Sequence, residues 1–150
     1  MRFSPQEEYG LRCMLAIAKA HGENRSLTIP EISETEKIPE PTVAKILRLL
    51  RINGFLISER GHTGGYALSR APEKIFVNEL LQTLGGKLFD ETSCEKFHAD
   101  SEICIHIKNC NVRELWKTLQ EAIDKALSGM TLSDLANLKI KNSVEKNSDT

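Results

Sequence analysis

The sequence predicts a mainly helical fold with one small β-hairpin, followed by a long separate helix. Two helix-start signals within the first 31 residues each precede apolar residues at helical spacing. A glycine-rich segment at residues 61–65 separates two short runs that suit β-strands. A chain of 150 residues is long enough for one ordinary core and an added element.

The first two helices are predicted by capping boxes, in which a Ser or Thr and a Glu three residues later satisfy free N–H groups. Ser4–Glu7 and Thr28–Glu31 both have this form, with a proline in the first turn. We expect the first helix to end at Gly22 and the second at about Glu36. The apolar side of the first helix consists of Leu11, Met14, Leu15 and Ala18. Cys13 falls within this pattern and is expected in the core.

A third helix is expected after a tight turn, because prolines at positions 39 and 41 interrupt the second one and Gly54 ends the third. Its inward residues are Val43, Ile46, Leu47 and Leu50. This leaves Thr42, Lys45 and Arg48 on the outer side. The range Pro41–Ser58 contains cations but no acid. Such a face is either ordinary solvated surface or a DNA contact, and its single sign of charge favours DNA.

Phe55–Arg60 and Tyr66–Ser69 are expected to form two strands joined by the five-residue loop Gly61–Gly65. A hairpin directly after a helix-turn-helix predicts a winged helix-turn-helix, which binds double-stranded DNA. Arg60 and His62 flank the first glycine of this wing. They either serve the turn or enter the minor groove, whose negative potential attracts arginine.

The second half of the chain contains a short expected helix at 77–84 and a third capping box, Asn111–Glu114, before a long helix ending near Gly129. Its apolar stripe consists of Leu115, Leu119, Ala122, Ile123, Ala126 and Leu127. The winged helix-turn-helix domain, which we call the head, is complete before this helix begins. We therefore expect a second copy of the chain to cover the stripe. Thr131–Leu138 predicts a last helix, and Lys139–Thr150 a disordered tail.

These features divide the chain into four parts: a winged helix-turn-helix domain at 1–85, a cysteine-rich loop at 86–110, a dimerisation helix with a return helix at 111–138, and the tail at 139–150. No segment has the length of a membrane span, and the N-terminal residues lack an apolar run of signal-peptide type. We therefore expect a cytoplasmic protein without a membrane partner. The sequence has no evident catalytic His/Asp/Ser arrangement, so an enzyme is not expected.

Three cysteines, Cys94, Cys104 and Cys110, lie in a polar stretch with nine and then five residues between them. Structural disulfides are rare in a reducing cytosol, and this stretch offers little core in which to bury thiols. The spacing therefore favours an iron-sulfur cluster, whose thiolate ligands converge from irregular loops. The alternative is a structural zinc site completed by His98 or His106, in a DNA-binding or interaction protein without redox sensing.

Together these residues resemble the bacterial iron-sulfur winged-helix transcription regulators that include IscR, NsrR and RirA. The similarity covers nearly the whole chain and rests on Met1–Ser4, the wing Arg60–Tyr66, the three cysteines and Met130–Leu135. It implies a homodimer joined by the long helix, with a [2Fe-2S] or [4Fe-4S] cluster nearby and two heads that bind halves of a palindromic operator. It also implies a repressor that senses nitric oxide, oxidants or iron status.

The chain departs from this family at two positions. The interval between its first two cysteines is longer than in better-known members. In addition, Arg113 stands where IscR-like members have a histidine as the fourth cluster ligand. NsrR-like members instead use an acidic residue in the first helix of the other subunit, and the matching residue is Glu8. The ligands implied by the resemblance are therefore Cys94, Cys104, Cys110 and Glu8.

Overall fold

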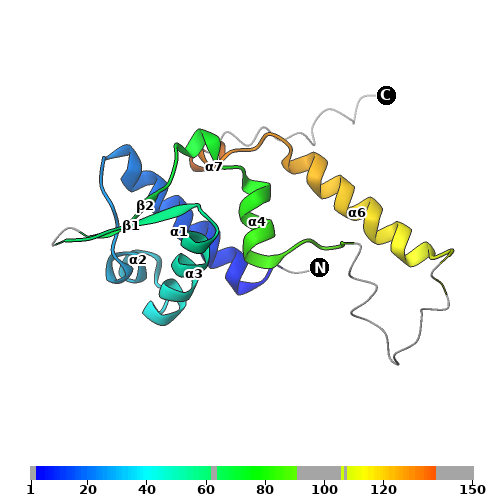
Figure 1. Cartoon of the computed structure of the whole chain (residues 1–150), viewed down its shortest axis with the longest axis horizontal. Helices are drawn as coiled ribbons and strands as arrows, with labels where there is room; N and C mark the ends of the chain where they lie inside the picture. The colour runs from blue at the N-terminus through cyan, green and yellow to red at the C-terminus, as the bar shows by residue number, and fades with distance from the viewer. Residues whose placement is uncertain (1–2, 62–63, 91–105, 107, 138–150) are drawn as a thin grey trace. The chain divides into compact units, whose positions relative to one another are not determined.

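The computed structural model describes residues 3–61, 64–90, 106 and 108–137, and Figure 1 labels its helices and strands. These residues fall into two compact units. One contains the residues up to Gly85 together with those from Gly129 onwards, and the other is Gly86–Ser128. The predicted mainly helical fold with a small hairpin is confirmed. The tail at 139–150 lies outside the described residues.

Three helices begin the chain: α1 (Pro5–Gly22), α2 (Ile29–Glu36) and α3 (Glu40–Ile52). Both predicted capping boxes are present, since the Ser4 and Thr28 side chains accept hydrogen bonds from the N–H groups of Glu7 and Glu31. The two glutamate side chains accept from the capping residues' own N–H groups in return. Lys37 ends α2 with a left-handed φ of 56°, which turns the chain into α3.

The wing consists of β1 (Leu56–Glu59) and β2 (Gly65–Leu68), which pair antiparallel. The predicted hairpin is confirmed, although β1 is shorter than expected by one residue at each end and β2 is shifted by one residue toward the loop. A bridge that sequence reasoning missed joins β2 to Leu27, whose N–H and C=O both bond Tyr66 at 3.1 and 2.7 Å. A Cβ at Gly65 would lie 2.5 Å from the Leu27 oxygen, so this approach requires glycine.

The remaining elements of the first unit are the 3₁₀ turn η1 (Pro72–Lys74), α4 (Val77–Gly85) and α7 (Leu132–Ala136). Two backbone hydrogen bonds attach the segment before α7 to the head. The Val77 N–H donates to Met130 at 3.0 Å, and the Leu132 N–H donates to Ile75 at 2.8 Å. The Leu132 side chain is fully buried, so the chain returns to the core of the head after its long helix.

The core of this unit is formed by side chains from α1, α2, α3, α4, the wing and α7. All four residues expected on the inward side of α3 are buried, which confirms the predicted orientation of that helix. Cys13 is also buried, as expected from its place in the apolar pattern of α1. Leu11 and Leu15 are partly buried and pack against the same core.

The second unit contains α6 (Asn111–Leu127). The expected capping box at its start is wrong by one residue, because Cys110 is the N-cap and its sulfur accepts a hydrogen bond from the Arg113 N–H. Within this unit the Phe89 N–H donates to Gln120 at 3.2 Å. Val112, Leu115 and Trp116 remain exposed. In the part of the chain that the structure describes, no helix is long and apolar enough to span a membrane.

Candidate nucleic-acid interface

The outer face of α3 carries the residues expected to meet DNA. Lys45 and Arg48 are exposed and Thr42 is half-buried, while Val43, Ile46 and Leu47 are buried in the core. The face exists because the apolar residues recur at helical spacing, which leaves one stripe of the helix to solvent. The structure thus presents both cations outward from a rigid element.

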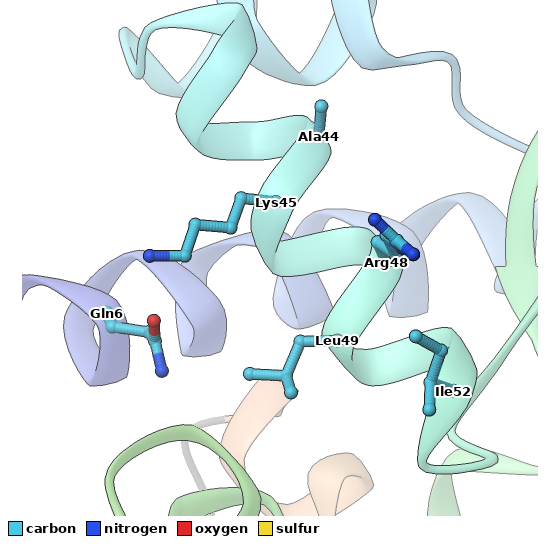
Figure 2. A pocket seen from close by; sticks show the side chains of 6 residues that line it. All are labelled: Gln6, Ala44, Lys45, Arg48, Leu49 and Ile52. Carbon is cyan, nitrogen blue, oxygen red and sulfur yellow. The ribbon is translucent and has the colours of Figure 1, made fainter.

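A hollow of about 520 Å³ lies along this face (Figure 2). It is lined by Gln6, Ala44, Lys45, Arg48, Leu49 and Ile52. Figure 2 shows that α3 contributes all of these side chains except Gln6, which comes from the first turn of α1. The Gln6 amide donates to the Leu84 carbonyl and so connects α1 to α4. The hollow combines an apolar lining with two cations, a combination suited to a sugar-phosphate strand and base edges.

Four lining residues of this hollow were not predicted as site residues: Gln6, Ala44, Leu49 and Ile52. Ala44, Leu49 and Ile52 have no charge or polar group to signal a site, and Gln6 lies in the first turn of a different helix. In the structure Ile52 stands out because it is 64% exposed, although isoleucine is usually buried. That exposure becomes visible only once the end of α3 is placed in three dimensions.

The wing presents Arg60 in an exposed position at the end of β1. Two glycines shape the turn that follows. Gly61 has a φ of +121°, and the Gly64 N–H donates to its carbonyl at 2.9 Å. A Cβ at Gly64 would lie 2.8 Å from the Glu59 oxygen, so a larger residue would distort the turn. His62, the other predicted wing residue, lies outside the described residues.

Two of the four predicted cluster ligands are described, and they belong to different units. Glu8 is exposed on α1, and Cys110 is half-buried at the start of α6. The Arg113 N–H lies 3.3 Å from the Cys110 sulfur. Cys94 and Cys104 lie outside the described residues. Within the described residues, no group of three or more His, Cys, Asp or Glu side chains is assembled for a metal ion.

The fourth cysteine is unsuited to ligation. Burial raises the pKa of the Cys13 thiol to about 11, with the nearby Glu36 carboxylate raising it further and Arg12 opposing the shift. Arg12 itself is engaged by α2, because its Nε lies 3.1 Å from a Glu36 carboxylate oxygen and its guanidinium also donates to the Glu36 carbonyl. Cys13 therefore stays a protonated core thiol.

A sequence model of the Rrf2 family, described as an iron-dependent transcriptional regulator, matches residues 3–138. The chain belongs to the Rrf2 family. The resemblance inferred from the wing and cysteine motifs is thereby confirmed, and winged-helix regulators of this family share its fold.

Two relatives illustrate the range of the Rrf2 family. The chain is 31% identical over 136 residues to the regulator CymR of Bacillus subtilis, covering 91% of this chain and 90% of that one. It is 30% identical over 137 residues to the regulator IscR of Erwinia tasmaniensis, covering 91% and 79%. Both relatives are named as HTH-type transcriptional regulators. The chain is accordingly a transcription regulator and not an enzyme.

Solved structures of the Rrf2 family agree with this fold. The structure titled CymR, the global cysteine regulator of B. subtilis, superimposes with a TM-score of 0.71 at 28% identity, covering 92% of this chain and 98% of that one. The IscR of T. potens superimposes with a TM-score of 0.70 at 24% identity, covering 93% and 88%, and supports the fold alone. The helix-turn-helix and wing thus occur in a family that regulates transcription.

Proposed function

We propose that this chain is a homodimeric, iron-sulfur-containing repressor that binds a palindromic operator and senses nitric oxide, oxidants or iron status. The observation that carries the DNA-binding part is the outward placement of Lys45 and Arg48 on α3. In winged helix-turn-helix proteins the exposed face of such a helix enters the major groove. We assign Thr42, Lys45 and Arg48 to that groove, and Arg60 with His62 to the flanking minor groove.

The proposed cluster rests on the chemistry of its donors. Three thiols and one carboxylate suit an iron-sulfur centre, because thiolates are the ligands that iron in such clusters favours. Cys110 supports this assignment, since a helix N-terminus favours negative charge and its sulfur already accepts an N–H at 3.3 Å. A bound cluster would supply a group that reacts with oxidants and nitric oxide. Cys94, Cys104, Cys110 and Glu8 are the proposed ligands.

The exposed apolar side of α6 supports the proposed dimer. Val112, Leu115 and Trp116 are 59%, 54% and 40% exposed, which is high for large apolar residues on an amphipathic helix. A second copy of the same helix fits this side because a two-fold axis lets one patch cover itself. Dimerisation would place two heads on one operator, and such a regulator would act in the cytoplasm.

A second candidate effector follows from the CymR relative, which is named a global cysteine regulator. A chain of this family that responds to cysteine would need no iron. Metal content separates the two possibilities, and the same measurement identifies the zinc-containing alternative.

The proposed DNA contacts predict a different loss of operator affinity for each of two variants. Lys45→Ala should weaken operator binding and, if Lys45 meets only phosphate, lower the salt slope by about one. The loss of affinity in Arg60→Ala should be largest on operators with A/T-rich flanks, because the narrow minor groove there has a more negative potential that attracts arginine. Fluorescence anisotropy titrations across a range of salt measure both effects at equal cluster content.

The matched control for these titrations is Lys19→Ala, which removes an exposed cation from the end of α1 remote from the hollow. It should bind as the wild type does. Unchanged affinities for both Lys45→Ala and Arg60→Ala at every salt concentration would contradict the DNA assignment.

The ligand assignment of Glu8 predicts a changed cluster in Glu8→Ala. A carboxylate oxygen is a harder ligand than thiolate and is held more weakly by iron in such a centre. The variant should therefore keep the cluster but lose it faster in air, with a shifted visible spectrum. The neighbouring Glu7 is unsuitable as a control because its side chain closes the cap of α1. An exposed glutamate on α2, Glu34, provides the control variant, and a spectrum and decay rate unchanged in Glu8→Ala would remove Glu8 from the ligands.

A further inference from the structure

Arg70 lies at the root of the wing, where β2 ends and the chain turns toward η1. Its guanidinium contacts three separate segments of the head. Nη1 donates to the Gly54 carbonyl at 3.1 Å, and Nε donates to the Lys74 carbonyl at 3.0 Å. Nη2 lies 3.5 Å from a carboxylate oxygen of Glu79 on α4. One side chain thus connects the end of α3, the turn η1 and α4.

The contact at Gly54 connects Arg70 to both DNA-binding elements. Gly54 lies between α3 and β1 with a φ of +82°, and its carbonyl also accepts the Ser69 hydroxyl at 2.5 Å. The next residue, Phe55, has its ring 5.2 Å from the Arg70 guanidinium carbon. Phe55 donates to Leu50 of α3 and accepts from the Ser69 N–H, both at 3.0 Å. The angle at which the wing leaves α3 is therefore set at this junction.

From these contacts we propose that Arg70 is a positioning residue for operator binding, which holds the wing at the angle that lets Arg60 and α3 engage one duplex together. This proposal rests on the proposed DNA contacts of Arg60 and Lys45. Arg70 does not need to touch DNA. Only arginine fits the role, because the planar fork reaches two carbonyls and a ring face at once, whereas lysine offers one compact ammonium group.

The experiment is a pair of double-mutant cycles on operator DNA with A/T-rich flanks, with Arg70→Ala combined once with Arg60→Ala and once with Lys45→Ala. We expect Arg60→Ala to weaken operator binding on the order of tenfold, and Arg70→Ala to weaken it by nearly as much. The Arg60/Arg70 double variant should then be no more than about twofold weaker than either single variant. The Lys45/Arg70 pair should be close to additive, whereas a general loss of folding would make both pairs additive.

Two further variants test whether the guanidinium group of Arg70 is required, rather than its charge or its ion pair. Arg70→Lys keeps the charge and should behave like Arg70→Ala, whereas Glu79→Gln removes only an exposed ion pair and should bind nearly as the wild type does. In the free protein, the Ser69 N–H that bonds Phe55 should exchange with solvent faster in Arg70→Lys. This readout needs no DNA and applies even if Arg70→Ala folds poorly.

The outcomes distinguish the positioning role of Arg70 from the DNA contact of Arg60. Loss of affinity in Arg60→Ala combined with additivity between Arg60 and Arg70 would overturn the positioning role alone. Full wild-type binding by Arg70→Lys would overturn it as well. No loss in Arg60→Ala on any flank would overturn the wing contact itself, and the role of Arg70 would fall with it.

Discussion

Replacing Cys104 by alanine is expected to abolish the visible chromophore and leave almost no iron bound after anaerobic purification. Thiolates supply most of the protein's bonds to an iron-sulfur cluster, so the loss of one of three leaves only two thiolates to hold it. Iron, acid-labile sulfide and the absorption spectrum measure the effect. Full iron and sulfide in Cys104→Ala would show that the ligand assignment is wrong.

Cys110 allows a sharper version of this experiment because its sulfur also caps α6. Serine is a good N-cap residue, so Cys110→Ser should keep the helix start while it replaces the thiolate with a poorer oxygen ligand. We expect wild-type helicity by circular dichroism together with reduced iron and a shifted spectrum. Cys13→Ala is the matched control, since this buried thiol is protonated and should leave the cluster unchanged.

Leu115→Glu is expected to convert the proposed dimer into monomers. In a two-fold interface each substitution occurs twice. Leu115 is 54% exposed, so its burial in the interface contributes about 1 kcal/mol, and placing a carboxylate there adds at least as much again. The dissociation constant of the dimer should therefore increase on the order of a thousandfold. Sedimentation equilibrium at micromolar concentration measures this directly, and operator affinity should fall because two linked heads become separate.

Lys117→Glu serves as the control because it adds the same acid at an exposed position of α6 outside the apolar stripe. It should remain dimeric. A Leu115→Glu variant that sediments as the wild type does would remove α6 as the interface between subunits.

The fold was predictable where one short segment contains the whole signal. The spacing of Val43, Ile46, Leu47 and Leu50 was enough to orient α3, and Ser4 was enough to start α1. Contacts between distant segments were missed. The bridge from Leu27 to Tyr66 joins residues 39 positions apart, and no local pattern specifies it.

The candidate site was predictable to a similar degree. Lys45 and Arg48 stand out because they interrupt an apolar helix with charge, and the structure places them outward as expected. Arg70 carries the same charge but was not singled out, because its role depends on carbonyls of the backbone that the sequence does not reveal. The start of α6 was misplaced since cysteine is an unusual N-cap.

The metal and sulfide content of the whole chain, purified without oxygen, tests whether this regulator carries an iron-sulfur cluster. We expect a brown protein that contains iron and acid-labile sulfide in similar amounts, with visible absorption that disappears on exposure to nitric oxide or air. A colourless protein, with zinc or with no metal at all, would contradict the iron-sulfur assignment.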